Sequence, residues 1–280
     1  MFLVGRSVAL ASFGTRSHFG FNYDKQGRDW TVEGGQRQSP IALWSCNTVS
    51  CNVPKLELVN YNKRLCDPLS VINNGLTVLM RIPNTVEGKQ PSLCISSEFG
   101  HVFEAQQLHF HWGSELFKGS EHNLDGRFYD GELHIVHKNA SFKTNQEAAL
   151  NCNGFAVLAV LLRTPESPAM NEICKQVSKI SELNDSQALE ESMSLEDLIV
   201  GVDTQKYLTY QGSLTTPPCA EAVIWFVFQT PLDVPKEHWQ NFWQLRDYRG
   251  KRVLNTYRVL QEDHERPVYR SKGSEVCPSK

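Results

Sequence analysis

The chain has 280 residues, of which 40% are hydrophobic and 21% charged, and its formal net charge is −3. This length allows one large domain with a well-buried core or two small ones, and the composition is typical of a globular protein. The near-neutral charge gives no support to nucleic acid or an anionic membrane as partner, and no apolar run is long enough for a transmembrane segment, so a small or neutral substrate fits at least as well.

The N-terminal segment, residues 1–18, has two interpretations. Its first twelve residues could be a weak secretory signal, although the apolar stretch is short and Arg6 interrupts it. The alternative is a disordered or truncated leader. Secretion is weakly favoured over a cytoplasmic location, and the compartment stays open.

Short β-prone segments separated by Gly, Asn, Asp and Pro follow. Val71-Ile72 and residues 76–82 flank Asn73-Asn74-Gly75, which predicts a turn between two strands. Further strands are predicted over residues 105–112, 131–137, 154–163 and 222–229.

Helical patterns are fewer. The best cover residues 171–180 and 236–245, and the second opens after Pro235. The polar region 181–197 is expected to form loops and short helical turns. The sequence therefore predicts one mainly β domain with peripheral short helices.

Two of the predicted strands carry histidines in alternation. Gln107, His109 and His111 share one face of the first strand, since residues two apart point the same way. On the second strand Glu132, His134 and Val136 share a face. If the strands are antiparallel neighbours, three imidazoles converge, and three nitrogen ligands with an open fourth position are typical of a catalytic zinc site.

The remaining histidines are interpreted as ordinary surface or core residues. His137 has the wrong parity on its strand, and no partner is evident for the others: His18, His101, His122, His238 and His264. A single His-x-His pair is itself a weak signal, because most strand histidines are structural.

Several motifs together carry a more specific signal. They are HFHWG at 109–113, GSEH at 119–122, ELHIVH at 132–137 and GSLTTPP at 212–218, with RQSPI at 37–41, NNG at 73–75 and YR at 257–258. In this order they resemble the alpha-class carbonic anhydrases over about residues 19–271, which leaves 272–280 as a C-terminal tail.

The resemblance implies a fold and a reaction. The fold is a large twisted, mostly antiparallel central sheet with Zn²⁺ at the base of a conical cavity. The reaction is the reversible hydration of carbon dioxide to bicarbonate and a proton by zinc-bound hydroxide, which makes the protein a lyase (a carbonate dehydratase). Carbonic anhydrase is itself the standard example of a metal that lowers the pKa of bound water, from about 15.7 to about 7. We expect a monomer.

The resemblance also assigns residue roles. His109, His111 and His134 bind zinc, held respectively by Gln107, the Thr256 carbonyl and Glu132. Thr215 orients the hydroxide and donates its own hydrogen to Glu121. The residues expected against the substrate are Thr215, Thr216, Val136, Val157, Leu214, Val223 and Trp225; ordinary sheet core is the alternative for the apolar ones.

Three departures from the family pattern stand out. Leu76 occupies the position of the proton-shuttle histidine, so slow proton transfer is expected. Phe21 replaces a tyrosine and Leu79 a polar residue, which predicts a drier cavity.

The third departure concerns cysteine. Extracellular members pair a cysteine at the position of Glu33 with the one at Cys219. In this chain Cys219 is therefore either a free buried thiol or pairs differently among the eight cysteines. Asn139 and Asn184 lie in glycosylation sequons, which matter only on a secretory route.

Two other functions compete with the enzyme. One is a catalytically silent, carbonic anhydrase-like binding module, and the other is a structural zinc protein. Both are disfavoured because the three histidines, Glu121 and Thr215 are all present, and a structural zinc site normally closes all four positions with protein ligands.

Overall fold

A computed structural model describes residues 20–32, 34–49, 53, 55–96, 101–165 and 172–271. The predicted leader, residues 1–18, and the predicted C-terminal tail, residues 272–280, therefore lie outside the described residues. Within the described ranges, no helix is long and apolar enough to cross a membrane.

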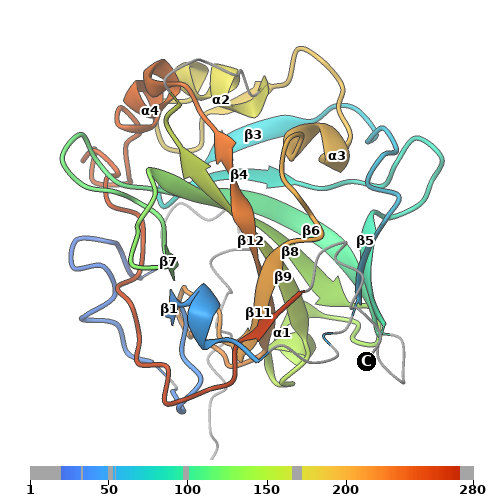
Figure 1. Cartoon of the computed structure of the whole chain (residues 1–280). Coiled ribbons are helices and arrows are strands. Elements are labelled where there is room, and N and C mark those ends of the chain that lie inside the picture. Colours follow the sequence, from blue (N-terminus) through green and yellow to red (C-terminus); the bar gives the residue numbers. More distant parts are fainter. Residues whose placement is uncertain are drawn as a thin grey trace, which may run out of the picture.

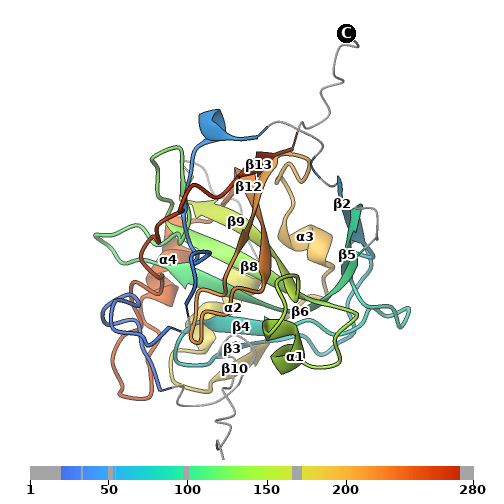
Figure 2. The same cartoon turned by 90° about the horizontal axis from the view of Figure 1, so that it is seen from below.

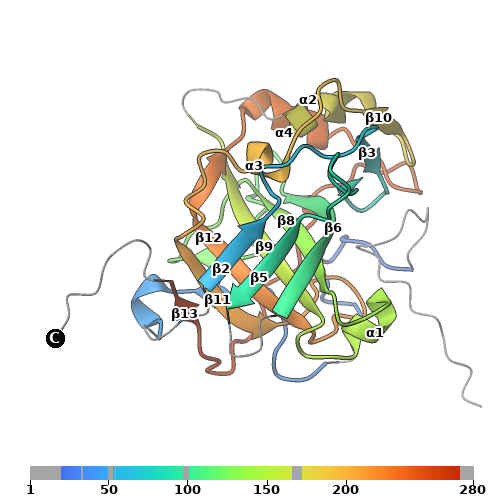
Figure 3. The same cartoon turned by 90° about the vertical axis from the view of Figure 1, so that its right-hand side faces the viewer.

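One large twisted sheet organises the chain (Figure 1). Its strands run in the order β10, β3, β4, β6, β8, β9, β12, β11, β13, with β2 and β5 continuing from β6 on a branch that Figure 3 shows in front. The bounds are β2 Lys55–Val59, β3 Ser70–Asn73, β4 Val78–Arg81, β5 Ser92–Ser96, β6 His101–Trp112, β8 Gly131–Asn139, β9 Phe155–Arg163, β10 Ser186–Ala188, β11 Tyr207–Gly212, β12 Val223–Asp233 and β13 Tyr269–Arg270. Neighbours are antiparallel except β9 and β12, which confirms the expected mostly antiparallel sheet.

The central strands are buried on both faces. Every residue of β8 is buried, and Figure 2 shows β8 in the middle of the sheet, between β9 and β6. Alternate residues of β8 belong to two different core clusters: Leu133 and Ile135 pack into one, and Val136 into the other. The neighbouring β9, FAVLAVLLR, reads as a nearly continuous apolar run because neither of its faces meets water, whereas β8 carries polar side chains among its apolar ones. His134 lies on the same face of β8 as Val136.

The turn between β3 and β4 has the predicted chemistry. Asn74 Oδ1 accepts the backbone N–H groups of Leu76 and Thr77 at 3.0 and 2.9 Å, and Gly75 adopts a φ of 83°. An asparagine oxygen and a glycine with positive φ are what a tight turn requires. This turn fixes the position of Leu76 between the two strands.

The helices are short and peripheral, as predicted. They are α1 Asn145–Ala149, α2 Glu172–Gln176, α3 Leu195–Leu198 and α4 Lys236–Phe242, with 3-10 turns η2 Ser45–Asn47 and η3 Val177–Lys179; a small parallel pair joins β1 Ala42–Leu43 to β7 Asn123–Leu124. Figure 1 shows α2 and α4 together beyond one end of the central strands.

Two expectations from the sequence need correction. The helix after Pro235 ends at Phe242 rather than at residue 245. Region 181–197 is not only loops and helical turns: β10 lies within it and pairs antiparallel with β3. The pairing gives a backbone partner to a polar segment that has no β pattern of its own.

Candidate active site

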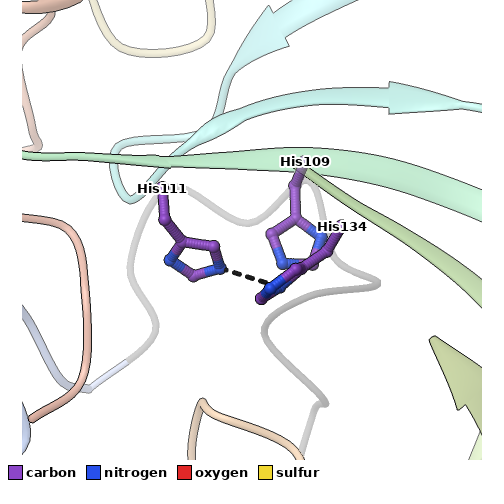
Figure 4. A group of neighbouring side chains, drawn as sticks. All are labelled: His109, His111 and His134. Atoms are coloured by element: carbon purple, nitrogen blue, oxygen red, sulfur yellow. Dashed lines mark hydrogen bonds between the residues drawn. The ribbon is translucent and has the colours of Figure 1, made fainter. Parts of the chain in front are cut away.

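Strands β6 and β8 bring three histidines together. His109 lies directly opposite His134 in their antiparallel register, and His111 lies two residues further along β6 on the same face. One nitrogen from each of the three imidazoles falls within 4.8 Å of the others (Figure 4). The convergence expected from alternation is thus present in the structure.

Each imidazole is held by its other nitrogen. His109 Nδ1 is 3.0 Å from Gln107 Oε1, His111 Nδ1 is 2.6 Å from the Thr256 carbonyl oxygen, and His134 Nε2 is 2.8 Å from Glu132 Oε1. All three acceptors require an N–H donor, so the opposite ring nitrogen carries a lone pair. These are His109 Nε2, His111 Nε2 and His134 Nδ1, and the last two lie 3.1 Å apart.

The cluster favours neutral imidazoles. Burial lowers the pKa of His111 to about 3, and it lowers the pKa of His109 and His134 below the ordinary value; a charge on one neighbouring imidazole would disfavour a charge on the next. Neutral imidazole is the form that binds a metal. Three such donors with no thiolate fit zinc and leave a fourth position for a small ligand.

Glu121 lies buried beside the cluster. Its Oε1 accepts the Arg258 backbone N–H at 2.8 Å, while Oε2 lies 3.5 Å from His111 Nε2 and 4.0 Å from His134 Nδ1. Oε2 has no hydrogen-bond partner among the described residues. Burial and the nearby Glu132 charge hold the pKa of Glu121 well above its ordinary value, although the Thr215 side chain and the Arg258 N–H act in the opposite direction.

Thr215 and Thr216 are buried in the loop between β11 and β12. Next to them the five apolar residues expected against the substrate belong to one buried cluster: Val136, Val157, Leu214, Val223 and Trp225. The Trp225 ring centroid lies 4.8 Å from that of His134. The structure therefore brings an apolar wall up to the histidines.

Leu76 belongs to a small separate apolar cluster. It packs with Tyr23, against which Phe21 and Trp30 also lie. Tyr23 rather than Phe21 makes the ring contact with His111, at a centroid distance of 6.5 Å. Leu79 pairs with His109 across β4 and β6. Tyr23 was not predicted from the sequence; the only available signal was an aromatic residue two positions beyond Phe21.

The prediction that His122 lacks a partner was wrong. His122 is fully buried, its Nδ1 donates to Glu132 Oε1 at 2.6 Å, and its Nε2 lies 2.7 Å from the Tyr210 hydroxyl. Glu132 Oε2 accepts the backbone N–H groups of Glu121 and His122 at 2.9 and 2.8 Å. One carboxylate thus fixes both His134 and the loop that carries Glu121. The position of His122 directly after Glu121 was the signal available in the sequence.

Of the two alternatives for Cys219, the structure shows the free thiol: within the described residues Cys219 is buried and unpaired, and burial raises its pKa to about 11. Glu33 lies outside the described residues.

Fold and site together define a protein with three converging histidines that could hold a metal ion, on a large β sheet. The sequence matches the family of eukaryotic-type carbonic anhydrases over residues 24–272. Carbonic anhydrase 5B, mitochondrial, of Homo sapiens is 32% identical over 243 residues, covering 85% of this chain and 74% of that protein. Carbonic anhydrase 6 is 31% identical in Homo sapiens over 274 residues (96% of this chain, 86% of that protein) and 33% identical in Mus musculus over 277 residues (93% and 84%). The chain belongs to the eukaryotic-type carbonic anhydrase family, a generally zinc-dependent family of lyases.

Proposed function

We propose that this chain hydrates carbon dioxide reversibly to bicarbonate and a proton at a zinc ion held by His109, His111 and His134. Family membership supports carbon dioxide hydration in general. The observation that carries the residue assignment is the convergence of three imidazole nitrogens, each with its opposite nitrogen engaged. When bound, zinc supplies a water molecule of lowered pKa and hence a nucleophile at neutral pH.

Gln107, Glu132 and the Thr256 carbonyl have an orienting role in this proposal. Each fixes the orientation and the tautomer of one imidazole ring, so that the lone pairs of the three free ring nitrogens point toward one position before the metal binds. Because Gln107 and the carbonyl are neutral, they leave most of the positive charge of the metal at the reaction site. Glu132 is the one carboxylate among the three holders.

Glu121 and Thr215 set the direction of the nucleophile. An ionised carboxylate only accepts hydrogen bonds, so Thr215 must donate to it and can present only a lone pair toward the histidines. Thr215 then accepts a hydrogen from the nucleophile and turns the nucleophile's own lone pair toward carbon dioxide. Burial and the nearby Glu132 oppose ionisation of Glu121, whereas the Thr215 hydrogen bond, the Arg258 N–H and the buried Arg258 guanidinium favour it.

Carbon dioxide is uncharged and has no permanent dipole, so an apolar surface suits it. The wall of Val136, Val157, Leu214, Val223 and Trp225 offers that surface beside His134. Thr216 supplies a neighbouring hydroxyl for the bicarbonate product. Attack at carbon then needs only a small displacement of the bound gas.

Metal content and hydration rate, measured on the same preparations, test the proposal. The purified wild-type chain should hold about one zinc, and the triple alanine variant of the three histidines should hold none. His264→Ala, at a partly exposed histidine remote in sequence, is the matched control and should keep its zinc. Full zinc occupancy in the triple variant would refute the ligand assignment.

Stopped-flow hydration separates the enzyme from a silent binding module. Thr215→Ala should retain zinc and lose roughly 10²-fold in rate, the scale of one oriented hydrogen bond in a transition state. A zinc-loaded wild-type chain that does not accelerate hydration would instead identify a binding module. Unchanged turnover in Thr215→Ala would remove Thr215 from the mechanism.

A further inference from the structure

The loop that carries Thr215 and Thr216 runs from Ser213 to Ala222 between β11 and β12. It closes on itself through three backbone hydrogen bonds, each 2.9 Å: Leu214 N–H to Ala220 O, Cys219 N–H to Thr216 O and Ala222 N–H to Ala220 O. These bonds fix the shape of the loop. They do not fix where the loop sits relative to Glu121, which comes from another part of the chain.

A single carboxylate ties the end of this loop to the segment of residues 35–39. Glu221 Oε1 accepts the backbone N–H of Gly35 at 3.0 Å, the backbone N–H of Arg37 at 2.8 Å and Gln38 Nε2 at 3.0 Å. The Arg37 guanidinium lies 3.4 Å from Oε2. Hydrogen bonds to an ionised acceptor are the strong ones, and four donors converge here.

Gly35 and the Glu221 carboxylate approach each other closely. A Cβ added at Gly35 would lie 2.7 Å from Glu221 Oε2, so any other residue at position 35 would require the Glu221 carboxylate to shift. Although burial alone would raise the pKa of Glu221, the bonds from Gln38, Arg37 and Gly35 lower it, so the carboxylate stays charged at neutral pH.

The same segment holds the start of the loop. Ser39 and Ser213 exchange two hydrogen bonds: the Ser39 N–H donates to Ser213 Oγ at 2.9 Å, and the Ser213 N–H donates to Ser39 Oγ at 3.0 Å. Gln38 Nε2 also donates to the Cys219 carbonyl at 3.2 Å. Residues 35–39 are thus hydrogen-bonded to the loop at both of its ends.

Arg258 connects residues 35–39 to Glu121. Its guanidinium donates to Gln38 Oε1 at 2.9 Å and to the Ser39 carbonyl at 2.8 Å, while its own backbone N–H donates to Glu121 Oε1. Residues 35–39, which hold the loop, are therefore also connected through Arg258 to the Glu121 carboxylate, the proposed acceptor of the Thr215 hydroxyl.

We propose that Glu221 is a positioning residue, which holds the 213–222 loop so that the Thr215 hydroxyl faces Glu121 and the histidine cluster. This inference rests on the proposed function, since it assigns Glu221 a role that acts through Thr215. Glu221 reaches the site through the loop and through Gln38 and Arg258.

A double-mutant cycle tests that route. Glu221→Ala should lower kcat/KM for hydration by roughly 10- to 100-fold with zinc content unchanged, because a small misplacement of an orienting group costs about that much. In the Thr215→Ala background the same change should cost less than about twofold, since the group it positions is already gone. Equal losses in both backgrounds would overturn the proposal, as would wild-type activity in Glu221→Ala.

Two more variants guard against a folding defect. Glu221→Gln keeps an oxygen that can accept the Gly35 and Arg37 N–H groups, and it should fall between wild type and Glu221→Ala. Glu262→Ala removes an exposed carboxylate and should behave as wild type.

Hydrogen–deuterium exchange gives a readout that does not depend on activity. In Glu221→Ala, peptides covering 213–220 should exchange about tenfold faster, whereas peptides from β8 should not change. Unchanged exchange in the loop would overturn the proposal even if the enzyme slowed. An inactive zinc-loaded wild type would remove the proposed function and leave this positional readout intact, so the two failures can be told apart.

Discussion

His137 should make the fold sensitive to acid. It lies on β8 three residues after His134 but on the opposite face, where it is completely buried. Its Nδ1 donates to the Ala156 carbonyl at 3.2 Å, and its Nε2 lies 2.7 Å from the Tyr61 hydroxyl. Burial lowers the pKa of His137 to about 3.

The sign of the effect follows from where the proton binds. Unfolded His137 takes up a proton near its ordinary pKa of about 6.5, whereas the folded residue does so only near 3. The stabilising contribution is therefore fully present above about pH 6.5 and is lost as the pH falls toward 3. At about 1.36 kcal/mol per pH unit, the loss is about 2 kcal/mol at pH 5.

Urea unfolding at a series of pH values measures this loss. Wild type and His137→Gln, kept in the same metal state, share every other titrating group, so their difference isolates His137. Glutamine keeps an acceptor for Tyr61 but does not titrate. Between pH 4 and 6 the free energy of unfolding should fall more steeply in wild type, by up to about 1.36 kcal/mol per pH unit.

The pH dependence of stability in wild type and His137→Gln can also contradict the prediction. Glutamine will lower stability at every pH, so the slope rather than the absolute value is decisive. Parallel pH profiles for the two proteins would show that His137 does not titrate differently in the folded state, and the reasoning from burial would be wrong.

Two further predictions concern proton release and glycosylation. Each turnover should produce one proton, and because Leu76 cannot relay it, release of that proton to water should limit turnover to about 10³–10⁴ per second in weak buffer. Leu76→His should raise that rate and reduce the gain from added imidazole. A wild-type rate far above this limit that does not change when imidazole is added would contradict the prediction. On a secretory route, glycan should attach at exposed Asn184 and not at Asn139, which is buried with its amide donating to the Asn153 carbonyl; mass spectrometry that finds glycan on Asn139 in folded protein would disprove it.

The histidine cluster could be predicted because it depends on local regularity. Alternation along two strands places His109, His111 and His134 on one face, and only the antiparallel pairing of β6 with β8 had to be assumed. Gln107 and Glu132 came from the resemblance. Their geometry follows from the same parity, since each lies two residues before the histidine it holds.

Features set by long-range contacts could not be predicted. Tyr23 lies in a segment of successive turns with no period, so nothing local indicates which aromatic ring will reach His111. β10 forms only because β3 offers it an edge. His122 acquires its partners through Glu132 and Tyr210, which lie 10 and 88 residues further along the chain.

The tie between residues 35–39 and the Thr215 loop also determines which surroundings the site tolerates. Cys219 sits in that loop as a free thiol, and the contacts that Glu221 makes across the junction are hydrogen bonds. Thiol reductants do not break such bonds, so the loop keeps its place in a reducing compartment as well as in an oxidising one. Acid does weaken them, because protonating Glu221 removes the charge on which its donors converge. The junction is therefore indifferent to redox potential and weakens only in acid, below the ordinary pKa of a carboxyl group.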